Sequence, residues 1–334
     1  MLLYHNDGNG KFTEVSHKAA VDKPGKGLGV AIADYDHDGW PDILITNDSV
    51  PEQLFHNKGD GTFEEVAMVS GLALDGSGAT YAGMGVDFDD YTNDGWPDVV
   101  ITDLANQRYA LYKNAGDSTF DYLTNPTGLG AMTLLHSGWG VKFFDYDNDG
   151  WKDFFVAQSH VMDTIEIQEP HLHYREPPLL AWNDKGKKFV DVSADSGDIF
   201  QQKWVGRGLA TGDINNDGKV DVVITSNDGP AWVLMNETPT QNHWITLKLV
   251  GVKSNRDGIG AQVTVSTDAG KQYATVTTGG SYESSSDPRV HFGLGNATSV
   301  TLISIRWPSG IVQTLANTKA DQILSVTEGM SSAK

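Results

Sequence analysis

The chain has 334 residues, 44 acidic against 24 basic side chains, a formal net charge of -20, and no cysteine. This charge argues against nucleic acids and anionic membranes as partners, because both require a basic protein face. The missing cysteines exclude disulfides and thiolate metal sites. No apolar run approaches the ~18 residues of a membrane span, so no membrane insertion is expected. The length allows one large domain or two smaller ones.

The first residues do not form a targeting segment. Residues 1–7 contain neither the basic region nor the long apolar stretch of a signal peptide. If the protein is exported, its signal is expected to lie outside this sequence.

An acidic loop follows at residues 34–42 (loop 1). Asp34, Asp36, Asp38 and Asp42 occupy loop positions 1, 3, 5 and 9, and Gly39 occupies position 6. This spacing is typical of a loop that surrounds a hard cation such as Ca²⁺ with oxygen ligands. An EF-hand begins in the same way, but it ends with a glutamate at position 12, where this chain has an apolar residue.

The same loop recurs three times without gaps, at residues 90–98 (loop 2), 145–153 (loop 3) and 213–221 (loop 4). Each loop is preceded by a glycine-rich apolar run and followed by a β-branched or aromatic one. Short runs of this composition indicate strands, so each loop is expected to be a tight turn between two strands. Acidic turns also suit β-hairpins without any metal, but that alternative does not account for the carboxylates at positions 1, 3, 5 and 9 together.

A second phrase, which contains asparagine, glycine and phenylalanine, alternates with the loops at residues 6–15, 57–66, 114–121 and 183–192. It is typical of a hairpin turn that enters a short strand. Together the two phrases define a unit of four antiparallel strands that recurs every ~55 residues. The sequence therefore predicts an all-β fold, with a β-propeller built from four-stranded blades over residues 1–236.

The repeats resemble the FG-GAP (VCBS-type) repeats of integrin-α-like β-propellers, with G-V-x-x-x-D-Y-D-x-D-G-W-P-D as the matching phrase. The resemblance implies one Ca²⁺ in each loop, bound by the side chains at positions 1, 3, 5 and 9 and the carbonyl at position 7. Thr92 replaces a carboxylate and should weaken the second site, although Asp87 and Asp89 are close in sequence. Asn215 keeps an oxygen but loses a charge. The implied ligands are Asp34, Asp36, Asp38, Trp40 and Asp42 in loop 1, Asp90, Thr92, Asp94, Trp96 and Asp98 in loop 2, Asp145, Asp147, Asp149, Trp151 and Asp153 in loop 3, and Asp213, Asn215, Asp217, Lys219 and Asp221 in loop 4.

The spacing of the repeats lengthens between loops 3 and 4, which indicates an insertion between residues 158 and 182. Long loops on a rigid scaffold often carry binding residues. The insertion contains His160, His171, His173 and Tyr174, which are candidate acid, base or metal-binding groups if the protein is an enzyme. His171 and His173 could share a metal ion, but no third ligand is evident, so recognition by the loop as a whole is favoured.

The acidic loops stop near residue 236, where a polar segment with a proline follows. Residues 242–330 contain β runs without such loops and predict a small β-sandwich or barrel. The phrases at residues 255–261, 291–295 and 306–310 resemble the ASPIC/UnbV domain. The complete chain thus resembles the cartilage acidic protein family, a resemblance that implies an extracellular protein of mostly unassigned biochemical role.

The recognisable units do not account for a complete ring. The fourth unit supplies three strands, whereas residues 2–15 supply a hairpin without a preceding acidic loop. Either the N-terminal hairpin belongs to a small closed ring, or another chain completes a larger one. The larger ring is favoured, because the propellers of the family that the chain resembles are larger.

Two functions fit the sequence. The first is a secreted, Ca²⁺-stabilised adhesion or binding module that recognises a protein or a carbohydrate through loops on one propeller face. The second is an extracellular enzyme that acts on a polysaccharide or a small molecule in the central funnel of the propeller. The familiar nucleophile, phosphate-binding and dinucleotide motifs are absent from the sequence, so the binding module is favoured.

Overall fold

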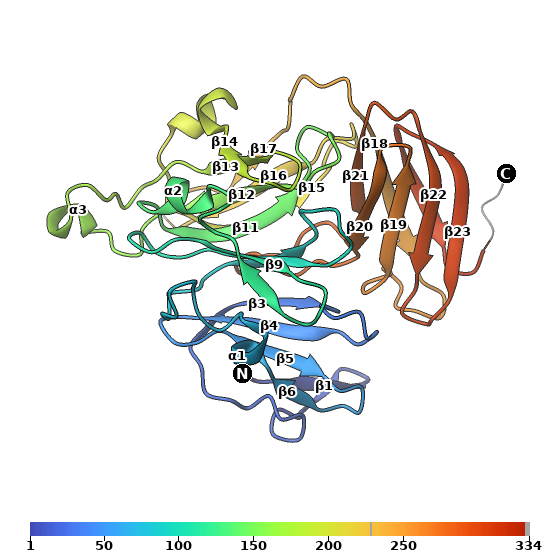
Figure 1. Cartoon of the computed structure of the whole chain (residues 1–334), viewed down its shortest axis with the longest axis horizontal. Helices are drawn as coiled ribbons and strands as arrows, with labels where there is room; N and C mark the ends of the chain where they lie inside the picture. Colours follow the sequence, from blue (N-terminus) through green and yellow to red (C-terminus); the bar gives the residue numbers. More distant parts are fainter. Residues whose placement is uncertain (228, 331–334) are drawn as a thin grey trace.

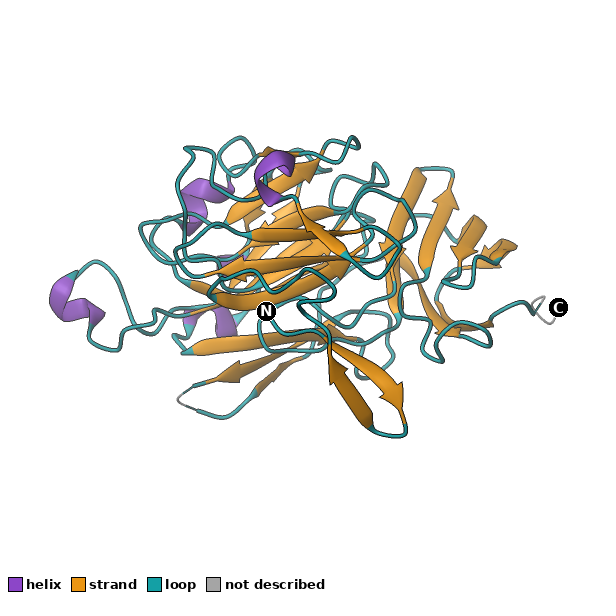
Figure 2. Cartoon of the chain, turned by 90° about the horizontal axis from the view of Figure 1, so that it is seen from below, coloured by secondary structure: helices purple, strands orange, loops and turns teal. Residues whose placement is uncertain are grey.

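The computed structural model describes residues 1–227 and 229–330, and it consists almost entirely of strands and loops (Figure 1, Figure 2). Four successive antiparallel sheets, termed blades 1 to 4, precede the C-terminal domain, so the predicted all-β fold class is confirmed. The first strand of each blade is termed its inner strand, and an acidic loop connects it to the second strand. Blade 1 comprises β3 (Gly27–Ala33), β4 (Asp42–Asn47), β5 (Gln53–Asn57) and β6 (Phe63–Glu65); blade 2 comprises β7 (Val86–Asp89), β8 (Asp98–Ile101), β9 (Ala110–Asn114) and β10 (Phe120–Tyr122); blade 3 comprises β11 (Gly138–Phe144), β12 (Asp153–Gln158), β13 (Leu179–Asn183) and β14 (Phe189–Asp191); blade 4 comprises β15 (Gly206–Gly212), β16 (Asp221–Ser226) and β17 (Trp232–Leu234).

Apolar side chains pack between successive blades. In the inner strands of blades 2 to 4, alternate residues face the preceding blade, because side chains along a strand alternate in direction. Val86 and Phe88 of β7 share a buried cluster with Leu44 of blade 1. Val141 and Phe143 of β11 share another with residues of blade 2. The inner strands of blades 2 to 4 therefore anchor each of these blades to the one before it.

The C-terminal domain is a sandwich of two sheets. One sheet has the strand order β21-β18-β24, and the other has the order β20-β19-β22-β23. A buried cluster that includes Phe292 and Trp307 joins the two sheets. The bounds are β18 (His243–Val250), β19 (Gln262–Thr267), β20 (Gly270–Thr275), β21 (Val290–Gly295), β22 (Ser299–Arg306), β23 (Val312–Lys319) and β24 (Gln322–Thr327).

Short helices occupy the connections between strands. They are α1 (Ala67–Ser70), α2 (Leu129–Thr133), α3 (Ile165–Gln168) and the 3₁₀ segments η1 (Ser193–Asp195) and η2 (Asp198–Gln201). Within the described residues, none of the helices has the length and apolar character needed to cross a membrane. Helix α3 lies in the insertion between β12 and β13 and projects away from the blades (Figure 1).

The N-terminal hairpin does not complete the fourth blade. Its strands β1 (Tyr4–Gly8) and β2 (Lys11–Glu14) form a separate two-stranded sheet, while blade 4 has the three strands expected from the sequence. Met1 and Leu3 instead pack against blade 1, beside Ile43 and Ile45. The blades therefore form an arc that begins at blade 1 and ends at blade 4, and the hairpin does not close it into a small ring.

The C-terminal domain contacts the centre of the arc through the connection between β20 and β21. In this connection, Ser281 pairs with Val86 of β7, and the ring of Tyr282 lies 5.0 Å from that of Trp139 in β11. The carbonyl of Tyr282 also lies close to Gly208 of β15. The connection thus runs along the inner strands of blades 2, 3 and 4, where the sequence had suggested a funnel for catalysis.

Candidate metal loops and neighbouring surfaces

The four acidic loops share one backbone geometry. In each loop, the amide of the second residue donates to the ninth-position carboxylate at 2.8–3.2 Å. The amide of the glycine donates to the first-position carboxylate at 2.7–3.1 Å. The loop glycines have φ between 84° and 97°, which a residue with a Cβ atom rarely adopts. The nine-residue pattern therefore specifies a compact turn whose own amides orient its carboxylates.

Loop 1 gathers carboxylates and one imidazole. Oxygens of Asp34, Asp36 and Asp38 lie within 4.8 Å of one another, and Asp36, Asp42 and His56 form a second such group. Nδ1 of His56 lies 3.2 Å from Asp36 and 3.3 Å from Asp42. Oδ1 of Asp34 is buried and has no hydrogen-bond partner among the described residues. Burial raises the pKa of Asp42 to about 7. A buried oxygen without a partner fits a bound cation.

Loop 3 gathers three carboxylates, those of Asp145, Asp147 and Asp153, within 4.8 Å of one another. Asp145 and Asp153 are buried, and burial together with the neighbouring carboxylates raises the pKa of both well above its usual value. Trp182 occupies the position that His56 has in blade 1, so this strand position supplies no cationic group. Carboxylates this close repel one another, and a divalent cation would compensate them.

Loop 2 differs because a lysine takes part in it. Nζ of Lys113 in β9 lies 2.5 Å from Oδ2 of Asp94. The hydroxyl of Thr92 at position 3 donates to Asp90 at 3.3 Å. Among the described residues, the groups of three acidic or imidazole side chains within 4.8 Å of one another include none from loop 2. Its carboxylates are therefore both fewer and better compensated than those of loops 1 and 3.

The two additional carboxylates near loop 2 are also paired. Lys142 donates to Oδ1 of Asp87 at 2.6 Å, and both side chains are buried. Lys152 forms a short ion pair with Asp89. Because each carboxylate already faces an ammonium group from blade 3, neither Asp87 nor Asp89 supplements the set that Thr92 weakens.

Loop 4 retains carboxylates at positions 1, 5 and 9, with an amide at position 3. The Asn215 side-chain oxygen accepts from the backbone amide of Asp217 at 3.1 Å, and its NH₂ group donates to the carboxylate of Asp217 at 3.0 Å. Arg289 of the C-terminal domain donates to the carbonyl of Asp213 at 2.6 Å. Loop 4 is therefore intermediate: like loop 2 it lacks one carboxylate, but among the described residues no lysine forms an ion pair with its carboxylates as Lys113 does with Asp94.

An asparagine links each of blades 2, 3 and 4 to the loop of the blade before it, a role that the sequence analysis missed. Its side-chain NH₂ donates to the second-position carbonyl of the preceding loop at 2.7–2.9 Å. It also donates to the eighth-position carbonyl of its own loop. For Asn114 and Asn183 the available signal was their place at the start of the second repeated phrase, whereas Asn236 lies in the polar segment that follows the fourth blade. The pairs are Asn114 with Tyr35, Asn183 with Tyr91, and Asn236 with Tyr146.

The candidate residues of the insertion do not converge on one site. His160 is buried, and its Nδ1 accepts from the backbone amide of Met162 at 3.0 Å. His171 and His173 are exposed and face separate glutamates at 3.6 and 3.9 Å. Tyr174 packs on a small apolar cluster around α3. The groups of potential metal ligands among the described residues include none of these side chains.

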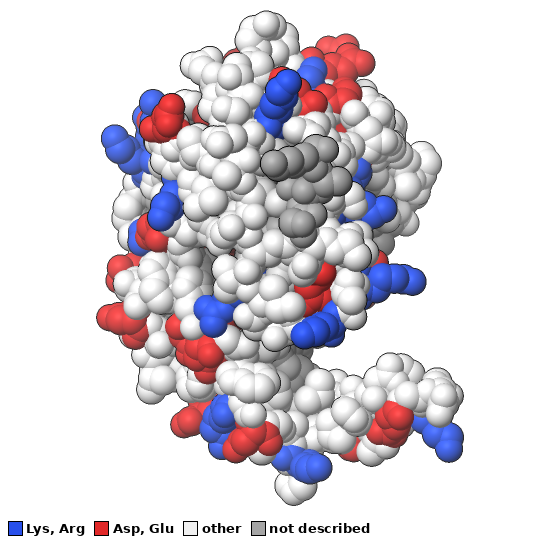
Figure 3. All heavy atoms as spheres, turned by 90° about the vertical axis from the view of Figure 1, so that its right-hand side faces the viewer, with Lys and Arg blue, Asp and Glu red and all other residues white. Residues whose placement is uncertain are grey.

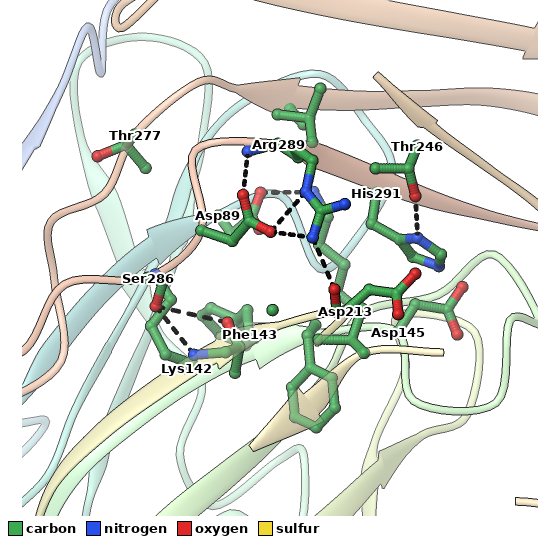
Figure 4. Close-up of a pocket in the computed structure, with 18 of the residues that line it drawn as sticks. Asp89, Lys142, Phe143, Asp145, Asp213, Thr246, Thr277, Ser286, Arg289 and His291 are labelled. Carbon is green, nitrogen blue, oxygen red and sulfur yellow. Dashed lines mark hydrogen bonds and ion pairs between the residues drawn. The ribbon is translucent and has the colours of Figure 1, made fainter. Parts of the chain in front are cut away.

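Two cavities lie between the blades and the C-terminal domain. The lining of the smaller, of about 110 Å³, includes Arg289, which donates to the Asp213 carbonyl, and His291, which is hydrogen-bonded to Thr246 (Figure 4). This cavity is smaller than a typical ligand pocket. The other, of about 370 Å³, is lined by Trp96 and Tyr273 together with carboxylates of loops 1 and 2.

The C-terminal domain also presents a mixed surface. On the face seen in Figure 3, lysine and arginine side chains are interspersed with acidic ones, and the described residues form no continuous basic surface there.

The blades, their acidic loops and the C-terminal sandwich define a β-propeller-type repeat protein with an added β domain. The FG-GAP-like repeat family matches residues 1–45, 35–101 and 90–156, and the FG-GAP repeat family matches residues 205–234. The ASPIC and UnbV family matches residues 251–333. The chain therefore belongs to the proteins that combine FG-GAP repeats with an ASPIC and UnbV domain.

Curated relatives agree with this assignment. Cartilage acidic protein 1 of Homo sapiens is 24% identical over 94% of this chain and 46% of its own length. The Xenopus tropicalis protein of the same name is 25% identical over 90% of this chain and 45% of its own length. The chain thus spans slightly less than half the length of these relatives.

Solved structures with partial similarity include a lectin from Agrocybe aegerita, described as recognising non-reducing terminal N-acetylglucosamine. It has a TM-score of 0.39 and 19% identity, and the match covers 71% of this chain and 60% of the lectin. A rhamnogalacturonan lyase from Bacillus licheniformis has a TM-score of 0.32 and 13% identity, with coverage of 90% of this chain and 61% of the lyase.

Proposed function

We propose that the chain is the Ca²⁺-stabilised part of an extracellular binding protein. The observation that carries this proposal is the close group of Asp145, Asp147 and Asp153 in loop 3, of which Asp145 and Asp153 are buried, supported by the unpartnered Asp34 oxygen in loop 1. Oxygen-rich loops of this kind suit Ca²⁺, which accepts several carboxylate and carbonyl ligands. Loops 1, 3 and 4 would provide their side chains at positions 1, 3, 5 and 9 and the carbonyls of residues 40, 151 and 219. Loop 2 has the weakest set.

The metal part of the proposal predicts a Ca²⁺-dependent stability. With a dissociation constant of ~0.1 mM and ~1 mM free Ca²⁺, each occupied site contributes about 1.4 kcal/mol by mass action. Thermal unfolding should therefore occur at a lower temperature in excess EGTA than in 1 mM Ca²⁺, and Mg²⁺ at the same concentration should restore less. An unchanged melting temperature in EGTA would contradict the metal assignment.

The extracellular location is supported by three features. The relatives are named for cartilage, the chain is strongly acidic, and hard-cation loops that bind in the ~0.1–1 mM range are filled where free Ca²⁺ is high. A fusion of the full chain to a secretion signal should yield folded, Ca²⁺-dependent protein in culture medium. Recovery of folded protein only from the cytosol would contradict this location.

Recognition of a protein ligand is supported by the insertion around α3. Val161, Met162 and Ile167 are 50%, 37% and 82% exposed on a segment that projects from the blades (Figure 1). Exposed apolar side chains on a projecting loop are typical of a protein-binding site. Carbohydrate is the second candidate ligand, supported by the cavity of about 370 Å³ lined by Trp96 and Tyr273.

Arrays of purified extracellular proteins and of glycans would test both ligand classes with the folded, Ca²⁺-loaded chain. Val161→Ser combined with Ile167→Ser should abolish binding to a protein ligand, whereas Tyr273→Ala should abolish binding to a glycan. Val312→Ser is a matched control, since Val312 is 63% exposed on the C-terminal domain. A ligand whose binding is unaffected by either change would contradict both assignments.

A further inference from the structure

One strand position lies beside the acidic loop in every blade. It is the residue directly before the asparagine whose backbone amide donates to the ninth-position carboxylate at 2.7–2.9 Å. In all four blades the residue before it pairs with the residue that directly follows the loop, so the register places this position, termed the flanking position, in the same way each time. The flanking residues of blades 1 to 4 are His56, Lys113, Trp182 and Met235.

Blade 2 has a flanking residue with a permanent positive charge. The ammonium group of Lys113 has three donors and no acceptor, so it cannot be a metal ligand while it is protonated. The imidazole of His56 instead lies 3.2 Å from Asp36 and offers a lone pair in its neutral form. Trp182 and Met235 are uncharged. Loop 2 is therefore the acidic loop for which the flanking position supplies an ammonium group.

This ammonium group contacts a carboxylate that a metal ion would need. Nζ of Lys113 lies 2.5 Å from Oδ2 of Asp94, which occupies position 5 of loop 2. Position 5 supplies one of the oxygen ligands in Ca²⁺ loops of this spacing. Among the described residues, no lysine lies within 4.0 Å of a carboxylate oxygen of Asp149, the aligned residue of loop 3, in the way that Lys113 contacts Asp94. The contact thus distinguishes two loops that are otherwise aligned residue by residue.

Loop 2 also has less negative charge to compensate. The hydroxyl of Thr92 at position 3 lies 3.3 Å from Oδ1 of Asp90 and 3.4 Å from Oδ2 of Asp98, so a neutral group stands between these two carboxylates. Loop 2 therefore combines three carboxylates with one ammonium group, whereas loop 3 has four carboxylates and loop 4 has three without a paired lysine. Because the attraction of a divalent cation grows with the number of uncompensated carboxylates, loop 2 has the least to offer Ca²⁺.

The turn itself does not require an ion. In loop 2 the amide of Gly95 donates to Asp90 at 2.8 Å and the amide of Tyr91 donates to Asp98 at 3.2 Å, as the aligned amides do in the other loops. We infer that Lys113 acts as the built-in cation of loop 2, so that this loop keeps the shared turn without taking up Ca²⁺. The inference rests on the proposed Ca²⁺ binding of the other loops. The residues of loop 2 thus do not fit the ion that the repeat pattern implies there.

Native mass spectrometry of the folded chain in Ca²⁺ would count the bound ions. The wild type should bind one ion in each of loops 1, 3 and 4. Asp94→Ala should leave the number of bound Ca²⁺ unchanged, whereas Asp149→Ala should lower it by one. The two variants are matched, because each removes a carboxylate that accepts from the amide of the seventh-position tryptophan, at 3.1 Å in loop 2 and 2.8 Å in loop 3.

A gain of binding separates the role of the lysine from that of the threonine. Thr92→Asp combined with Lys113→Met gives loop 2 the carboxylates of loop 3 and the flanking residue of blade 4, and it should raise the number of bound Ca²⁺ by one. Thr92→Asp alone should not raise it, because Lys113 still contacts Asp94. Lys188→Met is the matched control for the lysine change, since Lys188 forms an exposed ion pair with Asp184 outside the acidic loops. Added to Thr92→Asp, it should leave the number of ions unchanged.

The outcomes separate this inference from the Ca²⁺ proposal itself. Loss of one Ca²⁺ in Asp94→Ala would overturn the role of Lys113, because loop 2 would then bind an ion in the wild type. A gain of one Ca²⁺ in Thr92→Asp alone would also overturn it, since the threonine would then be what keeps the ion out. So would no gain in the double variant that still folds by circular dichroism. A chain that binds no Ca²⁺ at any loop would instead overturn the metal assignment, and this inference with it.

Discussion

Asn183 offers the sharpest test of how the blades are joined. Its side chain is fully buried, and its NH₂ group donates to the carbonyl of Tyr91 in loop 2 at 2.9 Å and to the carbonyl of Lys152 in loop 3 at 2.8 Å. Its oxygen accepts from the amide of Gly186 at 2.7 Å. Asn183→Ala removes all three hydrogen bonds and leaves two buried carbonyls, those of Tyr91 and Lys152, and the half-buried amide of Gly186 without this partner.

The expected cost follows from these contacts. A hydrogen bond contributes about 1 kcal/mol net, and a buried group left without a partner costs about 1–3 kcal/mol. The two buried groups and the half-buried one together predict a loss of roughly 3–5 kcal/mol, which is a large part of the marginal stability of a folded domain. Asn6→Ala is the matched control, because Asn6 is exposed and its side-chain oxygen accepts from Gly8 at 2.9 Å. This control should cost less than about 0.5 kcal/mol.

Urea unfolding in saturating Ca²⁺, followed by tryptophan fluorescence, would measure both variants. Asn183→Ala should shift the midpoint to clearly lower urea at an unchanged slope, and Asn6→Ala should leave it nearly in place. Equal midpoints for the two variants would refute the reasoning, since the buried asparagine would then contribute no more than an exposed one.

Three other changes have expected outcomes. Asp147→Ala should lower the melting temperature in Ca²⁺ more than Thr92→Ala, because only the first removes a charged ligand; equal effects would remove the distinction between the loops. Gly85→Ala should cost about 3 kcal/mol in urea unfolding, because the new Cβ would lie 1.9 Å from the carbonyl oxygen of Trp139, and a neutral result would show that this junction can relax. Burial lowers the pKa of His291 to about 4, whereas in the unfolded chain this side chain has a pKa of about 6.5. The neutral, buried His291 therefore contributes fully to the free energy of unfolding above pH 6.5, and this contribution is lost as the pH falls from 6.5 to 4. His291→Gln should therefore lose less stability than the wild type across this window, by up to about 3 kcal/mol, and identical pH profiles would contradict the assignment.

The parts of the fold that depend on local sequence were predictable. The loop glycines have the positive φ that the nine-residue pattern requires, and the flanking runs form the expected strand pairs. The contact of Lys113 with Asp94 was not predictable in the same way. It joins residues 19 apart and depends on the register of β8 against β9, in which Val99 faces Tyr112.

Long-range packing also determines the partners and the burial of other candidate side chains. Asp87 and Asp89 are near loop 2 in sequence, but lysines of the next blade pair with them. His160 and His171 are close in sequence, yet one side chain is buried under the insertion and the other is exposed on it. In each case the sequence identifies a chemical group correctly, whereas its partner comes from an element whose position only the assembled blades determine.

The asparagine contacts connect the loops to blade packing. The backbone amide of Asn183 donates to Asp153, a ninth-position carboxylate, at 2.7 Å, while its side chain holds the carbonyl of Tyr91 in the loop before it. A cation bound at Asp153 would therefore fix the same asparagine that joins blade 3 to blade 2. Because each of blades 2 to 4 repeats this arrangement, the loops lie at the junctions between blades as well as at the turns within them. The free energy of Ca²⁺ binding would then stabilise the arc across its blade boundaries, where the buried apolar contacts also lie.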